Sequence, residues 1–84
     1  AMSPAFLMQQ IAWREAVEDA ASDGDALVRL LRELDRDESV MVDDLRRALD
    51  DDKDLSLAAE LVRRLMFMEK LRREIGDALA RMDD

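Results

Sequence analysis

Residues 6–19 restrict the fold most, because as a helix they carry apolar side chains on two faces instead of one. At about 100° per residue, one face holds the spacing that is typical of a helix packed on a core. Its members are Phe6, Gln10, Trp13, Val17 and Ala20. The second face lies roughly 100 to 200° away and carries Leu7, Met8 and Ile11, followed by Glu15 and Glu18. One small bundle cannot easily bury both faces, so either another helix of this chain or a separate partner covers the second.

The first helix has clear start and stop signals. Ser3 is a candidate N-cap, and Pro4 suits the first helical position, where its missing N–H is not needed. We expect this helix to end near residue 21, because residues 22–25 combine a glycine with side chains that can cap the next helix.

Two longer helices are predicted to follow. One runs from Ala26 to about Asp51 without Gly or Pro, through a polar turn at residues 35–39, and its apolar positions are Leu27, Leu30, Leu31, Leu34, Met41, Leu45 and Leu49. The other is capped by Asp54 or Ser56, runs to about Arg81, and carries a core stripe of Leu57, Leu61, Leu65, Met68, Ile75, Leu79 and Met82. Phe67 lies roughly 120° from this stripe and is expected to face outward. The prediction is one all-α domain over residues 1–84, a three-helix bundle with a short first helix packed on a long antiparallel pair.

Composition favours a protein partner over other ligands. A net charge of -8 argues against a surface for nucleic acid or anionic lipid, since both require clustered cations. The chain has no Cys and no His, which removes thiolate chemistry and the usual zinc ligand and general base, so we expect no metal and no cofactor. No apolar run approaches the roughly 18 residues of a membrane span, and no leader is evident, so a cytoplasmic protein is expected.

The charged residues could form a dicarboxylate site or a calcium loop, but an ordinary solvent-exposed surface explains them better. The pairs Arg46–Arg47, Arg63–Arg64 and Arg72–Arg73 could clamp a dicarboxylate, as in small helical chorismate mutases, but they alternate with acids at helical intervals, which is typical of exposed ion pairs. The segment from Asp35 begins like a calcium loop, yet Val40 and Arg46 stand where Gly and a bidentate Glu are required. We therefore predict neither an enzyme nor a metal site.

Two segments resemble a known family. Residues 6–15 (FLMQQIAWRE) and 57–72 (LAAELVRRLMFMEKLR) are similar to the first and last helices of the C-terminal domain of HscB-type J-protein co-chaperones of iron–sulfur cluster assembly. The resemblance implies a three-helix bundle that binds the IscU-type scaffold protein and, through the full-length protein, delivers it to the chaperone HscA. Because the chain has no His, it lacks the His-Pro-Asp triplet, and we expect it to hold this domain without the J-domain.

The resemblance also implies a partner-binding surface formed by Leu7, Met8, Ile11, Glu15, Asp19 and Phe67. Its apolar members are the residues left off the core stripes, and its acids are expected to form a rim that selects a basic partner. Truncating Leu7 or Phe67 is expected to weaken binding far more than folding. The alternative is that the same residues bury against another copy of this chain, which would make it a structural homo-oligomer.

Overall fold

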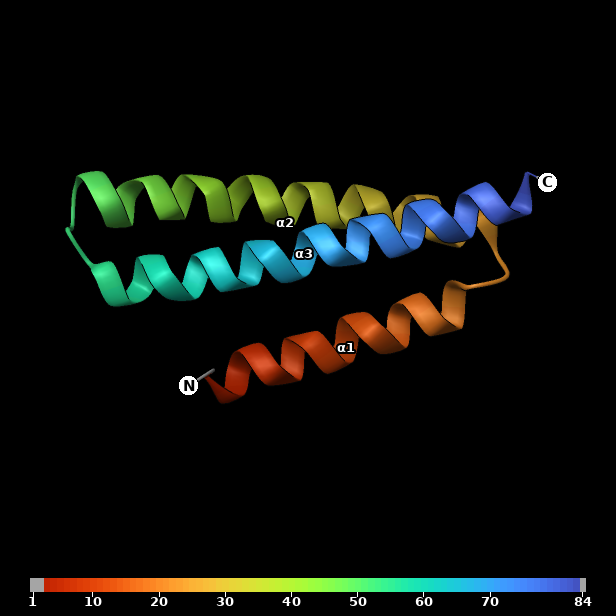
Figure 1. The fold of residues 1–84 in the computed structure, drawn as a ribbon, viewed down its shortest axis with the longest axis horizontal. Coiled ribbons are helices and arrows are strands. Elements are labelled where there is room, and N and C mark those ends of the chain that lie inside the picture. Colours follow the sequence, from red (N-terminus) through yellow and green to blue (C-terminus); the bar gives the residue numbers. More distant parts are fainter. Residues whose placement is uncertain (1–2, 84) are drawn as a thin grey trace.

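The bundle has three helices, α1 (Pro4–Ala20), α2 (Gly24–Asp50) and α3 (Leu55–Met82), in a computed structural model that describes residues 3–83. Helices α2 and α3 form a long antiparallel pair, and α1 lies along one side of it, running in the same direction as α3 (Figure 1). The predicted all-α three-helix bundle is confirmed. The two ends of the predicted domain, residues 1–2 and 84, lie outside the described residues.

Each helix begins at a side-chain cap. The acceptors are Ser3 Oγ for the Phe6 N–H (3.2 Å), the Asp23 carboxylate for the Ala26 N–H (3.1 Å) and the Asp54 carboxylate for the Leu57 N–H (3.0 Å). A cap of this kind satisfies one of the N–H groups that a helix start leaves unpaired. Because Asp23 provides the second cap, α2 starts at Gly24, two residues before the predicted start.

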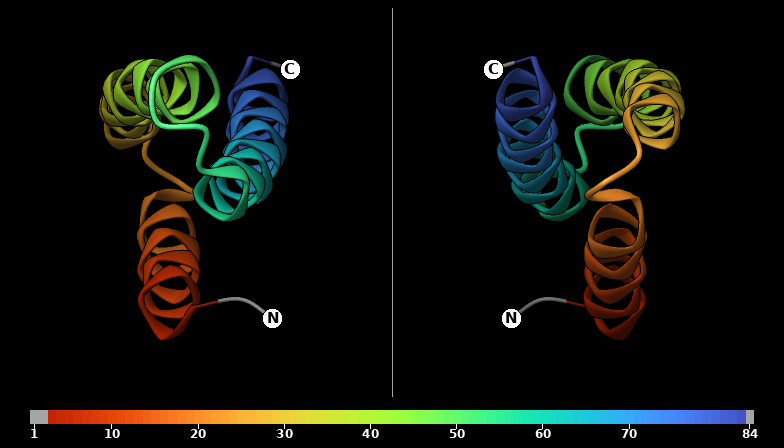
Figure 2. Two further views of the ribbon diagram at one scale, coloured as in Figure 1. Left: turned by 90° about the vertical axis from the view of Figure 1, so that its left-hand side faces the viewer. Right: turned by 90° about the vertical axis from the view of Figure 1, so that its right-hand side faces the viewer.

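The core is a line of apolar side chains between α2 and α3, closed on one side by part of α1. One cluster of buried residues comprises Leu34, Met41, Ala48, Ala58, Leu61, Met68 and Leu71, with Trp13 and Val17 of α1 packed against it. A second cluster comprises Ala20, Leu27, Ile75 and Ala78. In end view, α1 sits to one side of the pair, so one long side of α1 faces away from both other helices (Figure 2).

The core predictions need correction in two respects. Leu49 and Leu57 were expected inside but are exposed, because the connection between α2 and α3 projects beyond the start of α1 (Figure 1). Met82 is exposed as well, in the last turn of α3. The predicted stripes also left out buried positions, namely Leu71 and the alanines Ala48, Ala58 and Ala78.

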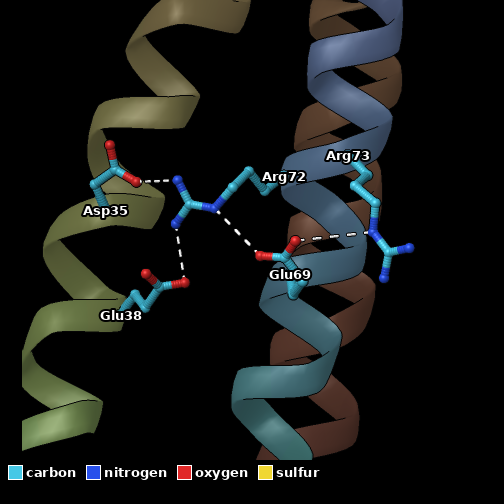
Figure 3. Close-up of polar contacts among 5 residues, drawn as sticks. All are labelled: Asp35, Glu38, Glu69, Arg72 and Arg73. Atoms are coloured by element: carbon cyan, nitrogen blue, oxygen red, sulfur yellow. Dashed lines mark hydrogen bonds and ion pairs between the residues drawn. The ribbon is translucent and has the colours of Figure 1, made fainter.

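Arg72 of α3 joins the two long helices. Its guanidinium donates to Asp35 and to Glu38 of α2, the latter at 2.9 Å, and lies 3.6 Å from Glu69 of its own helix (Figure 3). The hydrogen bonds to Asp35 and Glu38 raise the pKa of Arg72 above its ordinary value. The acids of the polar turn 35–39 therefore serve a contact between helices, and α2 continues through that turn as predicted.

Candidate protein-interaction site

Helix α1 exposes the second apolar face that its sequence contains. Leu7, Ile11 and Met8 are 42%, 58% and 70% exposed, whereas Phe6, on the packed side, is 2% exposed. We call Leu7, Met8 and Ile11 the exposed α1 face. On α1, Trp13 and Val17 pack against the core cluster, and they lie on a different face of the helix from Leu7, Met8 and Ile11. Neighbouring apolar side chains left open in this way are typical of a surface that another molecule covers.

A hollow of about 450 Å³ borders this face, between α1 and α3. It is lined by Gln10, Ile11, Arg14 and Glu15 of α1 and by Phe67 and Lys70 of α3. Three of the predicted site residues, Ile11, Glu15 and Phe67, therefore meet here. Leu7 lies one turn before Ile11, so the exposed α1 face and the hollow form one continuous surface.

Phe67 is held in place by contacts with α1. It is half-buried, and its ring meets that of Phe6 edge to face, with centroids 6.1 Å apart and planes at 82°. The Arg14 guanidinium lies 5.6 Å from the Phe67 centroid and forms an ion pair with Glu74 of α3. The expectation that Phe67 faces outward is wrong, because α1 crosses over this ring. Phe67 thus belongs both to the hollow and to the packing of α1.

Asp19 lies apart from the other predicted site residues. It lines a different hollow, of about 260 Å³, between α1 and α2 with Arg29 and Glu33. The reason is the helical twist: each step of four residues rotates a side chain by about 40°, so the three steps from Leu7 to Asp19 turn it by about 120°. The sequence series 7, 11, 15, 19 therefore winds from the α3 side of α1 to the α2 side.

Two cations in the hollow were not predicted as site residues. Arg14 and Lys70 lie there with Glu15, so the rim carries both signs of charge where only acids were expected. The sequence could have placed Arg14 beside this surface, because Arg14 stands seven residues after Leu7 and three after Ile11, on the same helix face. Lys70 had a similar signal, three residues after Phe67.

Ser3, the N-cap of α1, lies close enough to Glu60 of α3 to affect its carboxyl group. A hydrogen bond from the Ser3 hydroxyl is the main cause that lowers the pKa of the Glu60 carboxyl, with Arg64 and Arg63 adding to it. Arg64 lies 3.4 Å from Glu60, and its guanidinium is 5.4 Å from the centroid of the Phe6 ring. In the folded chain, Glu60 is therefore ionised to a lower pH than an ordinary glutamate.

This contact predicts an acid-dependent loss of stability. A carboxyl whose folded pKa lies below its unfolded value stabilises the fold above the unfolded pKa, about 4.3 for Glu, and loses that contribution as pH falls through the folded pKa. The wild type should lose unfolding free energy between pH 6 and pH 3, and we expect Glu60→Gln to lose less of it. Urea unfolding at each pH measures both values. Glu18→Gln, which removes an exposed carboxylate of α1, is the control. If both variants show the same dependence of unfolding free energy on pH as the wild type, Glu60 does not contribute to the acid-dependent stability.

The surface offers apolar contact framed by charges, with no metal-binding arrangement. Among residues 3–83, no group of three or more His, Cys, Asp or Glu side chains is placed to hold a metal ion. In the same range, no helix is both long enough and apolar enough to cross a bilayer. The arginines form ion pairs with nearby acids, such as Arg46 with Asp43 at 3.6 Å and Arg73 with Glu69 at 3.8 Å. This arrangement suits recognition of a protein surface.

Comparison with known proteins gives one consistent family. Residues 2–76 match the model of the HSCB C-terminal oligomerisation domain. The chain is 49% identical to the co-chaperone protein HscB homolog of Aromatoleum aromaticum, with 99% of this chain and 48% of the relative covered. It is 50% and 51% identical to the proteins of the same name from Azoarcus sp. and Paraburkholderia phytofirmans, with 100% of this chain and 49% of each relative covered. The chain thus spans about half the length of these relatives. No solved structure gives a significant match.

Proposed function

The chain belongs to the HSCB C-terminal oligomerisation domain family, and from that premise we propose that it is the protein-binding domain of a cytoplasmic iron–sulfur co-chaperone. In this proposal it binds an IscU-type scaffold protein, and the full-length protein delivers that scaffold to an HscA-type chaperone. The role is one of binding, without a catalytic step by this chain and without a cofactor of its own. The family resemblance of residues 6–15 and 57–72 supports the choice of partner.

The observation that carries the proposal is the exposed α1 face together with the adjoining hollow. Three large apolar side chains, Leu7, Met8 and Ile11, stand open to solvent on one face of α1, whereas Phe6 of the same helix is 2% exposed. The aromatic ring of Phe67, fixed by Phe6 and Arg14, lies beside them. Rigid apolar anchors at the centre of a surface, with charges around them, are the usual composition of an energetically important contact.

Each residue of the proposed site has a separate role. Leu7 and Ile11 act as anchors, and Met8, with its unbranched side chain, adapts to the shape of the partner. Glu15 favours a basic group on the scaffold. Arg14 and Lys70 on the same rim would repel a scaffold surface that carried only positive charges. Asp19 extends the contact towards α2. A scaffold segment with apolar side chains and both signs of charge would fit this surface.

Truncation of the two anchors tests the proposal. We expect the double variant Leu7→Ala/Ile11→Ala to raise the Kd for the scaffold by about 10- to 100-fold, the range in which removal of anchoring residues usually falls. Its thermal unfolding is expected to stay close to that of the wild type, because both side chains are exposed. Isothermal titration of the chain with a purified IscU-type scaffold gives the Kd, and circular dichroism gives the melt.

The matched control is Val28→Ala/Val42→Ala, which trims two exposed apolar side chains of α2. It should leave the Kd within about threefold, because these positions lie outside the proposed site. A wild-type chain that does not bind the scaffold contradicts the proposal. Equal weakening by the two double variants contradicts the assignment to α1.

A further inference from the structure

A second patch of large apolar side chains lies on the long helical pair, towards the connection between α2 and α3. This part of the pair extends beyond the start of α1 (Figure 1). The side chains of the patch are between 43% and 72% exposed. We call them the α2–α3 face: Val42 and Leu49 of α2, with Leu55, Val62 and Met66 of α3. Within each helix they are four or seven residues apart, so each set lies on one side of its helix.

The contacts of Arg72 place both sets on the same side of the pair. Arg72 of α3 donates to Glu38 of α2 at 2.9 Å and lies 3.6 Å from Glu69 (Figure 3). Val42 follows Glu38 by four residues, and Met66 precedes Glu69 by three. Because the helices are antiparallel, both steps lead along the same side of the pair towards its connection. The α2–α3 face therefore continues the side on which the Arg72 contacts lie.

Helix α1 packs on a different side of α3. Phe67 is adjacent to Met66 in the sequence and is therefore turned by about 100° around the helix. The Phe67 ring meets Phe6 of α1, whereas Met66 is 67% exposed. Among residues 3–83, no helix buries the α2–α3 face, since each of its five members remains exposed. One side of the helical pair thus carries α1, and another side is apolar and open.

The edges of the α2–α3 face carry cations, although the chain has a net charge of -8. Arg46 stands on the α2 edge, four residues after Val42 and three before Leu49. Arg63 stands on the α3 edge, next to Val62, and both arginines are exposed. Helix α3 as a whole carries six Lys or Arg residues and four Asp or Glu residues. A surface that matches this face is therefore apolar at its centre and acidic at its edges.

We propose that the α2–α3 face binds an amphipathic helix of a second protein, with an apolar stripe on this face and acidic residues beside Arg46 and Arg63. A helix laid along two antiparallel helices packs its side chains between theirs, and it would complete a four-helix arrangement. This is the usual way in which a helical segment is recognised by a helical groove. From Leu55 to Met66 the face rises about 16 Å, which matches three turns of a partner helix.

The size of the contact predicts weak, reversible binding. Three helical turns bury less than the roughly 1,200 Å² at which stable interfaces begin, so we expect a Kd between about 10 µM and 1 mM. The α2–α3 face shares no residue with Leu7, Met8 and Ile11. Both surfaces can therefore be occupied at once, which would let the chain hold two different proteins.

Titration with two labelled synthetic peptides tests this inference. One has about 18 residues of Ala, Leu and Glu, with Leu at helical spacing and Glu on both flanks, and its twin carries Lys in place of every Glu. By fluorescence anisotropy, the 84-residue chain should bind the glutamate peptide at least about fivefold more tightly than the lysine twin. Net charge alone would give the opposite order, since a chain at -8 attracts the lysine twin.

Truncation of the face tests where the glutamate peptide binds. Val62→Ala/Met66→Ala should raise its Kd by at least about fivefold, because two apolar contacts are lost. Leu7→Ala/Met8→Ala is the matched control, since its side chains are 42% and 70% exposed, against 43% and 67%. The control should leave the Kd unchanged. Circular dichroism melts of both variants should stay close to that of the wild type, because all four side chains are exposed.

Charge reversal tests the acidic edges of the partner. Arg46→Glu/Arg63→Glu should make the chain prefer the lysine twin. Arg29→Glu/Arg32→Glu changes the net charge equally at two exposed arginines near the start of α2, and it should keep the preference for the glutamate peptide.

Three outcomes overturn the inference. They are a wild-type chain that binds neither peptide at about 1 mM, a wild-type preference for the lysine twin, and equal weakening by the two truncation variants. None of these measurements uses the scaffold, so a failure here leaves the proposed function standing. Likewise, a chain that does not bind the scaffold can still bind the glutamate peptide.

Discussion

Leu71→Ala is expected to lower the free energy of unfolding by about 2 to 5 kcal/mol, the usual cost of removing a fully buried leucine side chain. Leu71 is 0% exposed and lies in the cluster where side chains of all three helices meet. A chain of this length has a total stability of about 4 to 13 kcal/mol. The variant should therefore be marginally folded, and urea unfolding followed by circular dichroism measures the loss.

Leu7→Ala removes the same atoms at a different place and is the control for Leu71→Ala. Because Leu7 is 42% exposed, its truncation should cost less than about 1 kcal/mol. Because both variants replace leucine with alanine, the difference in their loss of unfolding free energy distinguishes a core position from a surface position, and no partner is needed. If Leu7→Ala were as destabilising as Leu71→Ala, the exposed α1 face would be part of the core, and the proposed scaffold site would lose its basis.

Helix positions were predictable because their signals are local. Ser3 and Pro4 define the start of α1, and Asp23 and Asp54 cap the other two helices through their own neighbouring N–H groups. Each signal acts over three or four residues and needs no knowledge of the rest of the fold. The continuation of α2 through residues 35–39 was predicted correctly for the same reason, since this segment contains neither Gly nor Pro.

Packing between helices was less predictable because it depends on their relative register. Leu57 follows the periodicity of a core residue, yet it is exposed, because α1 is too short to reach it. Leu71 was missed because a single stripe was followed along α3, whereas this helix is in contact with two neighbours. The ion pairs from Arg72 to α2 and from Arg14 to Glu74 join residues 34 or more positions apart, which the periodicity of one helix cannot locate.

The proposed site was predictable in part. Exposure of Leu7, Met8 and Ile11 followed from counting the faces of one helix. Whether Phe67 belongs with them depends on the path of α1 across α3, which places its ring between Phe6 and the hollow. The sequence therefore indicated the apolar half of the surface, while the shared role of Phe67 in packing appears only once the helices are assembled.

Phe67→Ala is expected to affect folding and scaffold binding together. Loss of the edge-to-face contact with Phe6 and of the Arg14 contact should lower the free energy of unfolding by about 1 to 3 kcal/mol, less than for a fully buried phenylalanine. The Kd for the scaffold should rise by at least as much as in Leu7→Ala, because the start of α1 loses support. Met66→Ala, at the neighbouring outward position, should change stability by less than about 0.5 kcal/mol.

A double-mutant cycle over Phe6 and Phe67 identifies the physical origin of that loss. If the rings interact as the structure has them, the Phe6→Leu and Phe67→Leu variants should couple by about 0.5 to 1.5 kcal/mol in urea unfolding. Leucine keeps apolar volume at both positions, so the coupling reports the aromatic contact itself. If the two changes in unfolding free energy are additive, α1 does not cross Phe67 in this way. The Phe67 ring would then face outward as an anchor, as its position on the helix predicts.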